Sequence, residues 1–144
     1  MKSINEMHIK FPSKSLNEGF ARSVVSAFVM ELDPTIAELA DIKTAVSEAV
    51  TNCIVHGYRR EAGVVYIDAY IYEDKLVVLK IRDKGVGIED IKEAMKPLFT
   101  TAADEERAGL GFAVMQSFMD KVKVRSAVGK GTTVTLEKKI VPTR

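Results

Sequence analysis

Apolar residues alternate with polar ones in two neighbouring stretches of the chain, residues 64–72 and 76–82. The inward positions are Val65, Ile67, Ala69 and Ile71 in the first stretch, and Val77, Leu79 and Ile81 in the second. Successive side chains of a strand point to opposite faces, so this period of two predicts two strands with one apolar face each. The polar segment Glu73-Asp74-Lys75 between them is typical of a turn, which predicts a hairpin.

A second hairpin is predicted near the end of the sequence. The apolar positions of its first strand are Val122, Val124 and Val128, and the cationic positions on the solvent side are Lys121, Lys123 and Arg125. Gly129-Lys130-Gly131 is typical of a turn, and the closing strand then contains Val134 and Leu136. Weak alternation over His8–Phe11 predicts a short edge strand at the start.

Two long helices are predicted between the first strand and the first hairpin. The four-residue spacing of the first predicts an apolar stripe of Leu16, Phe20, Val24 and Phe28. Capping boxes at Ser15–Glu18 and Thr35–Glu38 predict where the two helices begin, and Asp33-Pro34 ends the first. The second helix is expected to end at Gly57 as a glycine C-cap. Its predicted stripe is Ile36, Leu39, Val46, Val50 and Cys53.

The region between the two hairpins is predicted to hold a lid. A short helix over about Glu89–Met95 ends before Pro97, and residues 98–107 show no periodicity. A connector of this length in a compact domain is often a functional loop. Gly109-Leu110-Gly111 is then expected to open a helix with the stripe Leu110, Val114 and Phe118.

These elements predict an α+β fold. Two antiparallel hairpins require a shared sheet, and helices gathered on one face of it give a two-layer α/β sandwich with a mixed, largely antiparallel sheet. The 144 residues fit one domain, residues 1–144, with a lid over about 97–110.

Composition excludes several classes of protein. Lys and Arg number 21 against 20 Asp and Glu, a net charge of +1, so no direct nucleic-acid partner is expected. No apolar run approaches the roughly 18 residues of a membrane span. The only cysteine, Cys53, cannot form an intramolecular disulfide, which suits a reducing cytoplasm.

Four short features occur in order along the predicted elements. They are Glu48-Ala-Val-Thr-Asn52 on a helix, Asp83-Lys-Gly85-Val-Gly87 after a strand, Gly109-Leu-Gly111-Phe112 before a helix, and Gly129-Lys-Gly131-Thr132-Thr133 before the last strand. Each alone is more often a plain surface, turn or helix start, but all four in this order are a rare coincidence. The chain lacks the spacing of a Walker A loop, a Rossmann fingerprint or a zinc site.

Parity and spacing single out residues in two of these features. Asp83 continues the inward positions of its strand, and a carboxylate buried there needs a donor or a ligand. Glu48 and Asn52 lie one turn apart on one helix face with Thr44 and His56. That face is either a solvated surface or a site, and His56 is expected to pack or to cap the helix.

The four features together resemble the motifs of the GHKL superfamily of ATP-binding domains, which includes histidine kinases and gyrase-type topoisomerases. The string from Glu48 to Tyr58 is similar to that of the short anti-sigma serine kinases of Gram-positive bacteria. Pro97-Leu98-Phe99-Thr100-Thr101 is most similar to their sporulation branch. One departure is Thr51, since larger GHKL ATPases often carry an acidic residue directly before the asparagine.

The resemblance implies a role for each motif residue. Glu48 would be the catalytic base and Asn52 a ligand of Mg²⁺, while Asp83 would accept the adenine amino group of ATP or ADP. The other residues it assigns to the nucleotide site are Gly85, Gly87, Thr100, Thr101, Arg107, Gly109, Gly111, Thr132 and Thr133. The glycines would allow a close approach of backbone to the nucleotide.

The resemblance also implies an activity and partners. Such a protein holds a sporulation sigma factor off RNA polymerase, and it phosphorylates a serine of an anti-anti-sigma protein. A homodimer is expected, with the helix that carries Leu16–Phe28 as the candidate surface for dimerisation and sigma contact, unless it only covers the sheet. The alternatives are a sibling stress-response kinase and an ATP-sensing module without catalysis, which would not need Glu48.

Overall fold

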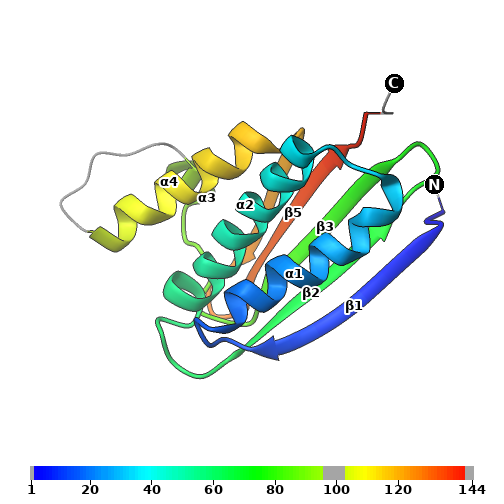
Figure 1. Ribbon diagram of the computed structural model, residues 1–144. Coiled ribbons are helices and arrows are strands. Elements are labelled where there is room, and N and C mark those ends of the chain that lie inside the picture. Colours follow the sequence, from blue (N-terminus) through cyan, green and yellow to red (C-terminus); the bar gives the residue numbers. More distant parts are fainter. Residues whose placement is uncertain (1, 96–102, 142–144) are drawn as a thin grey trace.

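Five strands form one antiparallel sheet, and helices cover one of its faces (Figure 1). The computed structural model describes residues 2–95 and 103–141. The strands are β1 (Asn5–Pro12), β2 (Val64–Ile71), β3 (Leu76–Asp83), β4 (Lys121–Ala127) and β5 (Gly131–Lys139), in the order β1-β2-β3-β5-β4. The α+β sandwich is confirmed. Every neighbouring pair is antiparallel, so the expectation of a mixed sheet is wrong in that detail.

The period of two in the sequence is matched by burial in the sheet. All seven inward positions predicted for β2 and β3 are at most 1% exposed, and cross-strand pairs such as Ile67 with Ile81 place them on the helix side. Val128 is an exception, since it is 69% exposed and outside the strand. Ala127 and Gly131 form the last pair of the β4–β5 ladder, so Val128 lies in the turn between the two strands.

The helical layer contains α1 (Asn17–Val29), α2 (Ile36–Asn52), α3 (Ile91–Met95) and α4 (Ala103–Phe118). A 3-10 turn, η1 (Met30–Leu32), follows α1, and a π-helical turn, η2 (Cys53–Gly57), extends α2. In Figure 1, α2 runs along the sheet between α1 and α4. Because α2 packs against both, its C-terminal end reaches the middle of the domain, over β3 and β5.

The buried stripe of α1 is shifted by one position along the chain from the predicted one. Ala21, Val25 and Val29 are at most 1% exposed, whereas Leu16 is 76% and Phe20 50% exposed. A small residue such as Ala21 lets α1 approach α2 closely, so the bulkier side chains lie at the flank. The capping box at Ser15 is wrong, because the Glu18 carboxylate instead accepts hydrogen bonds from Arg22 (3.0 Å) and from Thr51 of α2 (2.8 Å).

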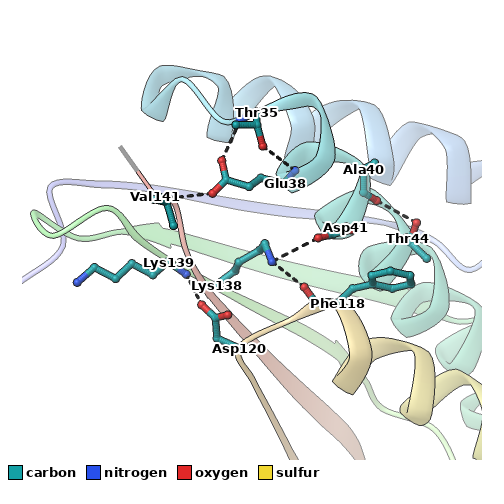
Figure 2. Close-up of polar contacts among 10 residues, drawn as sticks. All are labelled: Thr35, Glu38, Ala40, Asp41, Thr44, Phe118, Asp120, Lys138, Lys139 and Val141. Atoms are coloured by element: carbon teal, nitrogen blue, oxygen red, sulfur yellow. Dashed lines mark hydrogen bonds and ion pairs between the residues drawn. The ribbon is translucent and has the colours of Figure 1, made fainter. Parts of the chain in front are cut away.

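The capping box of α2 is present and is tied to the end of β5 (Figure 2). Glu38 accepts from the backbone N–H of Thr35 at 2.9 Å and, through its other oxygen, from the N–H of Val141 at 2.9 Å. Nearby, the Lys138 ammonium lies 3.5 Å from Asp41 and donates to the Phe118 carbonyl at 2.8 Å. These contacts fix the N-terminus of α2 and the C-terminus of α4 at one end of the sheet.

The second helix ends at the predicted residue, but Gly57 does not act as the predicted glycine C-cap. The chain remains helical to Gly57, but Gly57 has no positive φ and Tyr58 follows in a right-handed conformation. Ile36 is 89% exposed and is not part of the buried stripe, which is completed by Ile42, Ala45 and Ala49.

Helix α4 begins six residues before the predicted start. Ala103–Arg107, expected in a loop, is helical, and Gly109 and Gly111 therefore lie inside the helix. The sequence Ala-Asp-Glu-Glu-Arg explains this, because it combines helix formers with acidic residues in the first turn. Phe112 and Met115 of α4 are buried, as is Met119 just after it, while Phe118 is 38% exposed, so the predicted stripe is wrong at Phe118. The Leu110 side chain of that stripe lies outside the described residues.

Candidate functional site

A cavity of about 530 Å³ opens between the C-terminal end of α2, the end of β3 and helix α4. Its walls include Asn52, Cys53 and Gly57 from α2 and η2, Asp83 from β3, Phe112 from α4 and Thr132 from β5. His56 also lines it. Residues from all four sequence features thus lie around one space, although they are far apart along the chain.

Asp83 forms the floor of this cavity. The residue is only 4% exposed. Its carboxylate accepts a hydrogen bond from the Gly85 N–H at 2.9 Å, and the Cys53 thiol and the Thr132 backbone also bind it. Burial nevertheless raises the pKa of Asp83 above its ordinary value, against the effect of these donors. A buried carboxylate at the base of a cavity is a strong acceptor for a ligand that brings an N–H group.

Closely packed backbone surrounds the Asp83 carboxylate. A β-carbon on Gly57 would lie 2.7 Å from Asp83 Cγ, and one on Gly85 would lie 2.0 Å from the Gly57 carbonyl oxygen. The Val86 N–H donates to that same carbonyl at 2.9 Å. Gly87, with φ of 79°, then continues the turn against Ala127. The motif glycines are therefore required by close contact between backbone segments.

Asn52 and Glu48 lie next to each other beneath α4. A β-carbon on Gly111 would lie 3.2 Å from Glu48 Oε2 and 3.3 Å from Asn52 Oδ1, so α4 passes close over both side chains. The Asn52 amide nitrogen is fully buried and has no hydrogen-bond partner within residues 2–95 and 103–141. A buried polar atom without a partner is costly, and it marks a place where a ligand completes the site.

Thr132 and Thr133, two of the four threonines assigned by resemblance, face opposite sides of the sheet. Thr132 lines the cavity, and its hydroxyl lies 2.8 Å from that of Ser126, which itself accepts from the Ile88 N–H at 2.7 Å. Thr133 pairs with Arg82 and Arg125 on the face away from the helices. The structure thus brings Thr132 into the cavity and leaves Thr133 outside it.

Several assigned residues fall where little is described. Thr100 and Thr101 lie outside the described residues. Arg107 and Gly109 have backbone within α4, and their side chains are outside the description.

Three residues of the site were not recognised in the sequence. Cys53 was interpreted as part of an apolar stripe and Gly57 as a helix cap. Tyr58 has no assigned role in the string from Glu48 to Tyr58, yet its hydroxyl donates to the Val64 carbonyl at 2.6 Å and accepts from the Lys84 N–H at 2.7 Å. The four-residue step from Cys53 to Gly57 is the available signal, since it puts both residues next to Asp83, the last residue of β3.

The geometry fits a nucleotide with a divalent cation. A neutral amide oxygen is a suitable ligand for Mg²⁺, which usually takes few protein ligands and completes its shell with phosphates and water. No cluster of three acidic, histidine or cysteine side chains that could hold a metal ion occurs in the described part of the chain. Asp83 and Asn52 would hold the two ends of such a ligand. Among the described helices, none combines the length and apolar character needed to cross a membrane.

Sequence comparisons identify the family of the chain. Residues 11–138 match the histidine kinase-like ATPase domain family. The chain is 58% identical over 140 residues to the anti-sigma F factor of Thermoanaerobacter sp. strain X514, covering 97% of each chain. It is 56% identical to that of Geobacillus thermodenitrificans over 141 residues, and 54% identical to that of Clostridium acetobutylicum over 135 residues. The last two matches cover 97% and 94% of this chain, and 96% and 94% of the relatives.

Structural comparisons find the same fold at low sequence identity. The structure of the RsbU and RsbW domains of Rv1364c from Mycobacterium tuberculosis superposes with a TM-score of 0.68 at 20% identity, over 94% of this chain and 32% of that one. A histidine kinase domain from Erythrobacter litoralis gives a TM-score of 0.56 at 16% identity, over 85% and 61% of the two chains. With near-complete coverage and more than half of the residues identical to those of its relatives, the chain belongs to the anti-sigma F factor family, within the histidine kinase-like ATPase domains.

Proposed function

We propose that this chain is a Mg²⁺- and ATP-dependent protein serine kinase that also sequesters a sporulation sigma factor. The observation that carries the kinase proposal is the cavity with a buried acceptor, Asp83, at its floor and Asn52 in its wall, with Glu48 and Asn52 together beneath Gly111 of α4. The sigma-binding part is supported by the names of the relatives, which are anti-sigma F factors over nearly their full length.

Asp83 would recognise the base of ATP. An ionised carboxylate accepts hydrogen bonds and cannot donate them, so it favours the exocyclic amino group of adenine over the carbonyl of guanine. The close packing of Gly57 and Gly85 around it leaves the flat edge of a base as the fitting shape. Thr132, beside Asp83 on the neighbouring strand, would support the same end of the nucleotide.

Asn52 would bind the cation that accompanies the triphosphate. ATP carries about four negative charges, which Mg²⁺ neutralises and orients when bound. The buried amide nitrogen of Asn52, unpartnered in the described residues, is a donor, which a phosphate oxygen of the nucleotide would satisfy, and this leaves the amide oxygen for the cation.

Glu48 would act on the serine hydroxyl of the acceptor protein. It lies one helical turn before Asn52, and Gly111 keeps the backbone of α4 close to both. A carboxylate at that place can accept the proton of the hydroxyl or orient it as it attacks phosphorus. A module that only senses ATP has no use for a carboxylate there, which favours catalysis over the binding-only alternative.

Helix α1 would supply a surface for the protein partners and for a second copy of the chain. Leu16 and Phe20 are 76% and 50% exposed on it, and exposed apolar side chains at helical spacing suit a protein contact. The acceptor is an anti-anti-sigma protein in this proposal, and the sigma factor is of the sporulation type.

The test is transfer of label from γ-labelled ATP to a purified anti-anti-sigma protein, with and without Mg²⁺. We expect label on serine only when all three components are present. The acceptor protein is compared with a variant that lacks the phosphorylated serine. Binding to the sigma factor is measured separately by pull-down. ATP binding without any transfer would replace the kinase by the ATP-sensing module, and failure to bind sigma F would favour the stress-response sibling.

A further inference from the structure

The Cys53 thiol is buried directly against the Asp83 carboxylate. Cys53 is 3% exposed, lies in the first position of the π-turn η2, and lines the same cavity as Asp83. It hydrogen-bonds the Asp83 side chain. Burial, together with the neighbouring carboxylate, raises the pKa of Cys53 well above its ordinary value. The thiol therefore stays protonated and is the donor of this hydrogen bond.

The acceptor positions of Asp83 can be counted. An ionised carboxylate has two oxygens and about four lone-pair positions. The Gly85 N–H, the Thr132 backbone and the Cys53 thiol bind the group, so these three donors leave about one position for a ligand. Gly57 packs against the carboxyl group on the side of η2, which limits its rotation. The buried amide nitrogen of Asn52, unpartnered in the described residues, independently shows that this cavity is built to receive a polar ligand.

We infer that Cys53 is a positioning residue for base recognition: its S–H occupies one acceptor position of Asp83 and so directs the remaining one at the amino group of adenine. This inference rests on the proposed binding of ATP and adds a determinant of specificity to it. Without the thiol, the carboxylate gains a second open acceptor position and some freedom to rotate. A single, directed hydrogen bond to the 6-amino group would then contribute less to the choice of base.

The experiment compares two nucleotides that differ only in that amino group. ATP and purine riboside 5′-triphosphate are titrated in Mg²⁺ into the parent and three variants, and the ratio of dissociation constants is the measured quantity. Cys53→Ser keeps a donor, whereas Cys53→Ala and Cys53→Val lack one. Val is slightly larger than Cys, so it leaves no cavity, whereas Ser and Ala are smaller. The two nucleotides share phosphates and Mg²⁺, so the ratio isolates the base. Thermal melts of the ligand-free proteins report any change in the fold.

The parent should prefer ATP by about ten-fold or more, as expected for a hydrogen bond to a charged group. In the Ala and Val variants the preference for ATP should fall to about three-fold or less. In the Ser variant it should stay near that of the parent. If side-chain volume alone mattered, the Val variant would keep the preference for ATP and the smaller Ser variant would lose it, which is the opposite of this pattern. Should any variant fail to fold, the remaining pair of one donor and one non-donor carries the comparison.

The outcomes separate this inference from the proposal beneath it. A parent that prefers ATP, together with Ala and Val variants that keep the full preference, overturns the role of Cys53 and leaves ATP recognition by Asp83 intact. A parent that binds both nucleotides equally well shows that Asp83 does not recognise the amino group, and both proposals then fail at that point. A parent that binds neither nucleotide removes the proposed kinase function.

Discussion

Gly57 lies against Asp83 so closely that a β-carbon at residue 57 would stand 2.7 Å from both Cγ and Oδ2 of the carboxyl group. The contact joins the end of the helix that carries Glu48 and Asn52 to the end of the strand that carries Asp83. It therefore sets the separation between the two sides of the cavity. The hydrogen bond from the Val86 N–H to the Gly57 carbonyl, 2.9 Å, holds the two segments at that separation.

Gly57→Ala should therefore lower both stability and nucleotide affinity. Asp83 is buried and held by three donors, so it cannot move aside at small cost. Overpacking of this kind typically costs about 1–3 kcal/mol. Gly19→Ala in α1 is the matched control: the nearest heavy atom to its added carbon is Arg22 Nη2 at 3.5 Å, and the change should stabilise the helix by about 0.5–1 kcal/mol. Equal urea midpoints for the two variants would contradict the packing argument.

Gly111→Ala should lower phosphoryl transfer without lowering stability, whereas Gly57→Ala should lower both stability and nucleotide affinity. Alanine in the interior of α4 favours the helix by about 1 kcal/mol. Its methyl group would lie 3.2 Å from Glu48 Oε2 and 3.3 Å from Asn52 Oδ1, so these side chains must shift by a few tenths of an ångström. We expect an unchanged or higher melting temperature with phosphoryl transfer reduced about ten-fold or more, because small misplacements at a reacting centre are costly. A variant that is stabilised and fully active would show that α4 does not confine Glu48 and Asn52 during the reaction.

The sheet could be predicted from the sequence because its strands have one face in the core and one outside. Alternation then fixes both the element and the direction of each side chain, and the inward parity of Asp83 was predictable for the same reason. The same alternation explains why Thr132 lines the cavity and Thr133 lies on the other face of the sheet. Two adjacent strand residues cannot both face the cavity, and parity with Val134 selects Thr132.

The helices were predicted less well because packing overrides spacing. In α1 the buried stripe begins with Ala21, a small residue that carries a weak hydrophobic signal but fits the contact with α2. In α4, Gly109 and Gly111 suggested a helix start, while the preceding charged residues already favour a helix. The need for Gly111 comes from Glu48 and Asn52 on another helix, a contact that no local pattern contains.

Asn52→Ala should weaken Mg²⁺-ATP binding by about ten-fold or more, the scale of losing an interaction with a charged group of about 1.5–3 kcal/mol. The ligand-free protein should keep its stability, because the Asn52 amide nitrogen has no partner in the described structure to lose. Thr44→Ala, two turns earlier on the same helix face, is the control, since its hydroxyl binds only the Ala40 carbonyl of its own helix. Calorimetry is run with Mg²⁺ and with a chelator. If the variant and the parent differ equally in both conditions, Asn52 acts on the nucleotide and not through the cation.

Glu48→Gln should separate binding from chemistry. The amide keeps the shape of the side chain and an oxygen that accepts hydrogen bonds, so ATP affinity and sigma binding should remain close to those of the parent. It cannot take up the serine proton, and a general base typically contributes about 10²–10⁴-fold in rate. Transfer to the acceptor protein is measured under single-turnover conditions, which exclude product release from the observed rate.

Glu73→Gln, in the exposed turn between β2 and β3, is the control for removing one negative charge elsewhere. A transfer rate within about three-fold of the parent would show that Glu48 is not the base, because that loss is smaller than general-base removal produces. An intermediate loss would favour orientation of the hydroxyl, since glutamine still accepts its hydrogen bond. Parallel losses of ATP affinity and transfer would instead place Glu48 with Asn52 in the binding of cation and phosphate, and the division of roles between these two neighbours would have to be abandoned.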